Sequence, residues 1–159
     1  MRFYFYRGKG FWAALIRWFT RSKYAHMSVV FEDGTVYESR PGKGVVKGKL
    51  KSVDGVTPFQ YKLGALPDSE RARVFCESEL GTPYDYWGCI CFILGIKQRR
   101  SQSRYFCSEF GADASVMAGI ELQERTETCK LSPDICAMSP VITIDHPRKF
   151  QWEHAGRYI

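Results

Sequence analysis

Short runs in which apolar or aromatic residues alternate with polar ones recur along the chain, and each run predicts a β-strand. Glycine, proline and aspartate separate the runs, as they do at turns. The predicted strands are residues 2–6, 26–31, 36–39, 45–46, 59–63 and 141–144.

Apolar residues at helical spacing predict helices over 11–19, 68–80, 84–94 and 107–118. Asp68 or Ser69 begins the second helix, and Gly81 and Gly119 end the second and fourth. A short turn or helix is expected at 131–134, a basic loop at 96–104 and an irregular tail at 150–159. Residues expected to be buried are Phe59, Tyr61, Leu63, Ala72, Phe75, Cys76, Leu80, Phe110, Gly111, Ala114, Met117 and Ala118. Neither a repeat nor a linker is evident, which favours one domain over 1–159.

The turn between the second and third strands decides which side chains share a face of the sheet. A two-residue Asp33-Gly34 turn would place His26 and Glu38 on opposite faces. A three-residue turn, 32–34 with Gly34 in the left-handed conformation, would make them diagonal neighbours about 7 Å apart. The sequence allows both turns, and we predict the three-residue one.

Cys107 stands where an extended run gives way to the fourth helix. Free N–H groups and the positive end of the helix dipole favour a thiolate at such a place. A thiolate is the nucleophilic form of cysteine, so Cys107 is a candidate nucleophile. The alternative is a small buried residue at a helix start, since free cysteine is commonly buried.

The chain of 159 residues has a net charge of +6 and a pI of about 9.0, which suits contact with an anionic surface such as phospholipid, cell-wall polymer or nucleic acid. The densest basic runs, 43–51 and 97–104, form no nucleic-acid-binding motif, so we expect no specific nucleic-acid partner. The start of the chain has no signal-peptide pattern, and synthesis and folding in a cytoplasm are expected. The aromatic helix 11–19 could touch a membrane or pack into the core.

The other five cysteines are expected to stay reduced in a cytoplasm. No pair of them has the spacing of a zinc site, and we expect neither a metal nor a cofactor. The sequence indicates core thiols at Cys76, Cys89 and Cys91, and leaves Cys129 and Cys136 open.

Four short motifs together resemble the circularly permuted branch of the NlpC-like, papain-fold cysteine hydrolases, which includes the lecithin:retinol acyltransferase-like enzymes. They are Tyr24-Ala25-His26, Tyr37-Glu38-Ser39, the stretch from Gly81 to Tyr86, and Tyr105-Phe106-Cys107-Ser108-Glu109. The stretch from Leu131 to Asp134 is also similar to the family's segment after the cysteine helix. The order of histidine, second polar residue and cysteine fits the family, and the likeness covers roughly residues 26–140. Bacteriophage-encoded members are similar as well.

The resemblance implies an α+β, permuted papain-like fold in which an antiparallel sheet packs against the cysteine-bearing helix. Its site would join Cys107 as nucleophile, His26 as base and Glu38, where some members have histidine, as the group that orients His26. The Cys107 N–H would face the oxyanion, with Tyr84 as a second donor.

The expected function is cleavage of an amide or ester bond, first of all in the peptide of peptidoglycan. Two other functions stay open. One is a lipid acyltransferase or phospholipid hydrolase. The other is a non-enzymatic binding module of a phage tail or virion, with tail proteins as partners.

Overall fold

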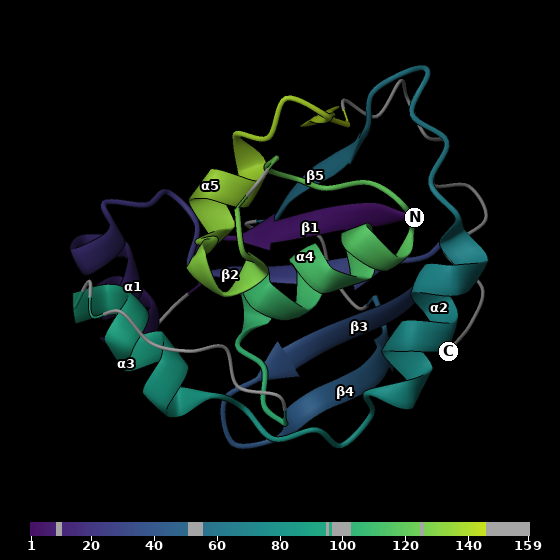
Figure 1. Cartoon of the computed structure of the whole chain (residues 1–159). Helices are drawn as coiled ribbons and strands as arrows, with labels where there is room; N and C mark the ends of the chain where they lie inside the picture. The colour runs from purple at the N-terminus through teal and green to yellow at the C-terminus, as the bar shows by residue number, and fades with distance from the viewer. Residues whose placement is uncertain (9–10, 51–55, 95, 97–102, 125, 146–159) are drawn as a thin grey trace.

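The computed structural model describes residues 1–8, 11–50, 56–94, 96, 103–124 and 126–145. These residues form an α+β fold with a six-stranded antiparallel sheet in the order β4-β3-β2-β1-β5-β6 (Figure 1). The strands are β1 (Arg2–Tyr6), β2 (His26–Val30), β3 (Thr35–Arg40), β4 (Gly44–Lys49), β5 (Val56–Tyr61) and β6 (Ile142–Ile144). The helices are α1 (Phe11–Thr20), α2 (Ser69–Ser78), α3 (Tyr86–Leu94), α4 (Cys107–Met117) and α5 (Pro133–Ala137), with a 3₁₀ turn at Thr128–Lys130.

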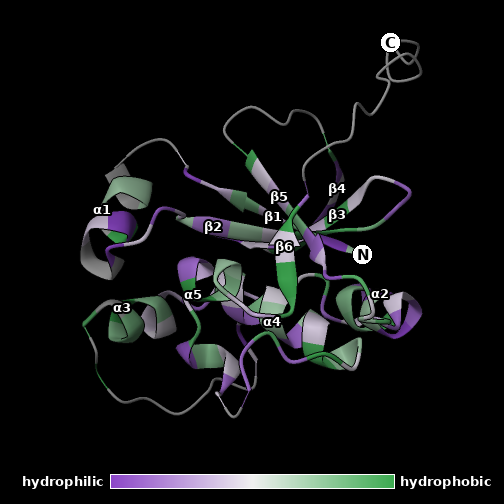
Figure 2. Ribbon diagram, turned by 90° about the horizontal axis from the view of Figure 1, so that it is seen from above, coloured by the Kyte–Doolittle hydropathy of each residue, from purple (hydrophilic) through white to green (hydrophobic). Residues whose placement is uncertain are grey.

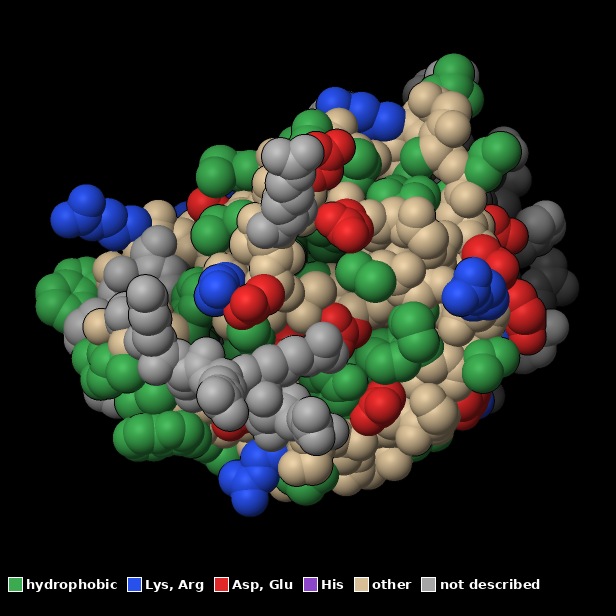
Figure 3. Space-filling model, viewed as in Figure 1, with side chains coloured by type: hydrophobic (Ala, Val, Ile, Leu, Met, Phe, Trp, Pro, Cys, Tyr) green, Lys and Arg blue, Asp and Glu red, His purple; other side chains and the backbone are tan. Residues whose placement is uncertain are grey.

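The helices α2, α3, α4 and α5 lie on one side of the sheet, and α4 runs across its middle (Figures 1 and 2). At one end of this layer α1 packs against α3. Seen from the helix side, apolar side chains are exposed at the edge where these two helices lie (Figure 3). None of the helices in the described ranges is long and apolar enough to cross a membrane.

The core lies between α4 and the sheet, and one glycine sets how closely the two approach. All residues of α4 from Cys107 to Ser115 are buried. A Cβ on Gly111 would lie 2.7 Å from Cε of Met27 in β2, closer than carbon atoms normally pack. The small residue therefore lets the helix that begins at Cys107 pack closely against the strand that begins at His26.

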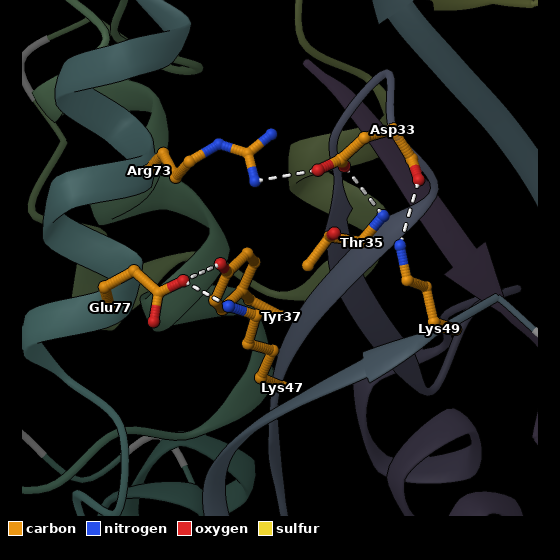
Figure 4. A network of polar contacts seen from close by, with 7 residues as sticks. All are labelled: Asp33, Thr35, Tyr37, Lys47, Lys49, Arg73 and Glu77. Atoms are coloured by element: carbon orange, nitrogen blue, oxygen red, sulfur yellow. Dashed lines mark hydrogen bonds and ion pairs between the residues drawn. The ribbon is translucent and has the colours of Figure 1, made fainter.

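Polar contacts connect α2 to β3, to β4 and to the turn before β3 (Figure 4). Arg73 donates to Oδ2 of Asp33 at 3.1 Å. Glu77 accepts from the hydroxyl of Tyr37 and, at 2.6 Å, from the ammonium of Lys47. These contacts hold β3, the strand that carries Glu38, from its helix-facing side.

The predicted strands and helices are all present, with differences at their ends, and residues 97–102 of the predicted basic loop lie outside the described residues. The helix predicted to begin at Tyr84 begins at Tyr86, because Tyr84 forms an isolated bridge with Tyr105. Three residues predicted to be buried are exposed: Leu63 lies beyond the end of β5, Leu80 lies beyond the end of α2, and Met117 is the last residue of α4. The tail at 150–159 lies outside the described residues.

Candidate active site

Three elements meet at one end of the sheet: the start of β2, the end of β3 and the N-terminus of α4 (Figure 1). The turn between β2 and β3 decides which residues of the two strands lie beside one another there. The N–H of Phe31 donates to the carbonyl of Thr35 at 2.9 Å, and Gly34 has φ +76°. This is the predicted three-residue turn with a left-handed glycine, which is confirmed.

That turn fixes the strand register, which brings His26 and Glu38 together. Val29 pairs with Tyr37, so one residue further along Ser28 lies opposite Glu38 and His26 is its diagonal neighbour. The two side chains are in direct contact, since Nε2 of His26 lies 2.5 Å from Oε2 of Glu38. Both side chains are mostly sheltered, with exposed fractions of 21% and 19%. The expected placement of Glu38 beside the ring is therefore confirmed.

The carboxylate of Glu38 is held in its charged form. Burial raises its pKa, but the hydrogen bond and charge of His26, with a smaller contribution from Arg40, outweigh burial and leave the pKa below the usual value. Nε of Arg40 lies 3.7 Å from the second carboxylate oxygen. Glu38 thus serves as an anion that orients the ring and stabilises its protonated form.

The Cys107 side chain also interacts with the ring of His26. Burial lowers the pKa of His26, but the charge and hydrogen bond of Cys107, followed by those of Glu38, raise it to about 10. Since Glu38 occupies Nε2, the nitrogen left for the thiol proton is Nδ1. The sulfur also lies 4.0 Å from the carbonyl oxygen of Ala25, the residue before His26. The site therefore favours an imidazolium beside the sulfur of Cys107.

The start of α4 supplies backbone donors beside the sulfur. Phe106 precedes the helix in an extended conformation, with φ −95° and ψ 167°, and makes no capping bond through its side chain. The first N–H groups of a helix have no partner within it, so the N–H of Cys107 can point at a negatively charged oxygen. This geometry suits an oxyanion site.

Tyr84 lies close to the sulfur, although in a bridge rather than in the predicted helix. Burial, followed by the charges of Cys107 and Cys89, raises the pKa of its hydroxyl strongly. A hydroxyl with a raised pKa keeps its proton and can donate it in a hydrogen bond. The hydroxyl also hydrogen-bonds with Cys89, and its role as a second oxyanion donor stays a prediction.

A hollow, a small cavity of about 20 Å³ that is open to solvent on one side, lies beside Cys107. Apolar residues make up most of its lining, contributed by α1, α3, α5 and the segments before β2 and α4. The lining residues are Ile16, Ala25, Tyr84, Cys89, Phe92, Phe106, Cys107, Ser108 and Pro133.

Two residues of this hollow with a thiol or hydroxyl group, Cys89 and Ser108, were not predicted to belong to a site. Cys89, predicted to be a core thiol, is only partly buried and lines the hollow, because α3 begins later than expected. Ser108 is 1% exposed, and its hydroxyl has no partner among the described residues. The one available signal was its position next to Cys107.

The remaining cysteines lie in the interior: Cys76, Cys91, Cys129 and Cys136 are buried. This confirms the prediction of core thiols for Cys76 and Cys91. The two other histidines, His146 and His154, lie outside the described residues.

No family profile and no curated protein matches this sequence. Among solved structures, the fold is similar to the crystal structure of the metalloprotein yiiX from Escherichia coli O157:H7, DUF1105. The TM-score is 0.67, with 17% sequence identity over 91% of this chain and 94% of that protein. At this identity the likeness concerns the fold alone.

The word metalloprotein in that description raises the question of a metal site here. In the part of the chain that the structure describes, no group of three or more His, Cys, Asp and Glu side chains is arranged to hold a metal ion.

Proposed function

We propose that the protein is a cysteine hydrolase of permuted papain-like fold that cleaves an amide or ester bond. The observation that carries the proposal is the alignment of Cys107, His26 and Glu38 across three elements. A nucleophile beside a base, with the base oriented by a third group, is the arrangement that acyl-transfer catalysis requires.

The proposed reaction has two halves. His26 takes the proton of Cys107, and the thiolate attacks the carbonyl carbon of the substrate. The carbonyl oxygen becomes an oxyanion, which the N–H of Cys107 and the hydroxyl of Tyr84 stabilise. When the bond to the leaving group breaks, the imidazolium gives its proton to the departing nitrogen or oxygen. Water, deprotonated by His26, then hydrolyses the thioester and frees Cys107.

Two substrate classes fit this chemistry. The peptide of peptidoglycan suits the positive charge of the protein, because such peptides carry carboxylates. The hollow beside Cys107 supports a second class, because its apolar lining suits an aliphatic acyl group of a lipid ester or amide.

The test is incubation of the full chain with muropeptides and, separately, with phospholipids, followed by mass spectrometry of products and intact protein. We expect cleavage of one class, a thioester mass on Cys107 in trapped samples, and no turnover by Cys107→Ala with an unchanged circular dichroism spectrum. Turnover by Cys107→Ala equal to that of the wild type would refute the proposal. Absence of cleavage in both panels would favour a binding module instead.

A further inference from the structure

The surface formed by α1 and α3 exposes large apolar side chains next to the candidate active site. Trp18 of α1 is 73% exposed, and on α3 Trp87 is 65% exposed. The other exposed apolar residues of this region are Tyr86, Ile90, Leu94 and Ile96. We call these six residues the α1–α3 surface. The space-filling view shows apolar side chains gathered at this edge of the molecule (Figure 3).

The helices that carry this surface also line the hollow at Cys107, with their other faces. Ile16 of α1 and Phe92 of α3 line the hollow, whereas Trp18, two residues after Ile16, lies about 200° further around α1. The ring of Tyr84, inside the hollow, packs edge-on against exposed Tyr86 with centroids 5.0 Å apart. A molecule covering the α1–α3 surface would therefore lie against the outer side of the two helices that border the hollow.

The charged residues in and just after α1 are all cations. The sequences of α1 and α3 contain no acidic residue. Arg17 lies in the last turn of α1 and Arg21 follows the helix with its side chain exposed. Lys23 is exposed too, although its N–H binds the carboxylate of Asp134. Tryptophan, tyrosine and aliphatic residues bordered by arginine are typical of a protein surface that enters an anionic lipid interface.

We propose that the α1–α3 surface docks on an anionic lipid bilayer. The cations would lie among the phosphates while Trp18 and Trp87 enter the headgroup region. A second copy of the chain is a poorer occupant, because two such surfaces facing each other would oppose arginine with arginine. A bilayer supplies the opposite charge.

Docking would bring a lipid acyl group to the apolar hollow. This step, unlike docking itself, rests on the proposed function of Cys107. Docking would favour lipid acyl groups over cell-wall peptide as the substrate class. The reason is that the bilayer contacted by the α1–α3 surface contains lipid and not cell-wall peptide.

The first experiment separates docking from catalysis by using full-length Cys107→Ala in vesicle co-sedimentation. Vesicles are phosphatidylcholine alone or phosphatidylcholine with phosphatidylglycerol. We expect binding to the mixed vesicles that weakens with added salt. Trp87→Ser should weaken this binding about tenfold, because a buried indole contributes about that factor. Leu66→Ser is the matched control: Leu66 is 91% exposed in the connection between β5 and α2 and should change nothing.

The contribution of positive charge to vesicle binding is tested by the same co-sedimentation measurement. Arg21→Gln should weaken binding to mixed vesicles about fivefold, since a cation near an anionic surface contributes about 1 kcal/mol. Lys62→Gln, an exposed cation just after β5, should bind as the parent protein does.

The outcomes distinguish the two proposals. Vesicle binding by Cys107→Ala without lipid turnover by the wild type would keep docking and overturn the lipid substrate. Equal loss in Trp87→Ser and Leu66→Ser, or no binding to mixed vesicles, would overturn docking. A Trp87-dependent dimer in gel filtration with no vesicle binding would assign the surface to a second copy.

Discussion

Glu38 and His26 lie on neighbouring strands, diagonal to one another, with 2.5 Å between Oε2 and Nε2. The two residues are twelve apart in the sequence. The hairpin turn fixes the register of their strands and therefore keeps their side chains in contact. The carboxylate can therefore hold one ring nitrogen while the other faces the sulfur.

Glu38→Gln should lower kcat by about 100-fold if His26 is a general base. The amide can still occupy the site, but it carries no charge to stabilise the imidazolium and no longer favours one tautomer. The measurement is steady-state kinetics on whichever substrate the wild type cleaves.

Arg40→Gln is the control for that variant. Arg40 also contacts Glu38, at 3.7 Å, but its side chain is 52% exposed and the pair is screened by water. We expect less than about a threefold change in kcat. An equal loss in both variants would mean that general disturbance of Glu38, and not the loss of its charge, causes the effect.

The protonation of His26 predicts how stability depends on pH. Its folded pKa of about 10 lies above the ordinary value of 6.5, so folding favours the imidazolium. The resulting stabilisation is fully present below pH 6.5 and is lost as the pH rises through about 10. The difference in free energy of unfolding between wild type and His26→Gln should therefore shrink over this window, as measured by urea denaturation.

The interaction between Cys107 and His26 predicts how the thiol changes the pKa of the imidazole. Because Cys107 contributes more than Glu38 to raising the pKa of His26, Cys107→Ala should lower that pKa. Titration of the imidazole protons by nuclear magnetic resonance measures it. An unchanged titration would show that the sulfur does not interact with the ring.

The strands and helices could be predicted because their signals are local. Gly34 and Gly119 have φ +76° and +84°, and Asp68 caps α2 by accepting from the N–H of Arg71. The contact between His26 and Glu38 could also be predicted, because it depends on the length of one turn.

Other features depend on tertiary packing that no local pattern encodes. Tyr84 pairs with Tyr105 instead of starting α3, because the segment before α4 lies beside it. The hollow combines residues of α1, α3 and α5, whose arrangement is absent from hydrophobic periodicity. Cys89 was therefore mistaken for a core thiol, and Ser108 carried no separate signal.

Tyr84→Phe tests the second oxyanion donor. If the hydroxyl stabilises the oxyanion, its removal should lower kcat about 100-fold with little change in KM. Tyr86→Phe is the matched control, because Tyr86 is a neighbouring tyrosine that is 52% exposed. Equal kinetics of Tyr84→Phe and wild type would restrict the oxyanion site to backbone donors.

Gly44 holds the turn before β4 against the segment that leads to Tyr84. Its φ is +70°, and an added Cβ would lie 2.2 Å from the carbonyl oxygen of Thr82. Gly44→Ala therefore combines backbone strain of about 1 kcal/mol with a clash of about 1–3 kcal/mol against backbone that cannot rotate away. Gly42→Ala separates the two effects, because Gly42 has φ +79° with nothing within 4 Å of the added Cβ. Thermal unfolding of both variants should show the larger loss in Gly44→Ala, and equal losses would mean that the Thr82 segment yields without cost.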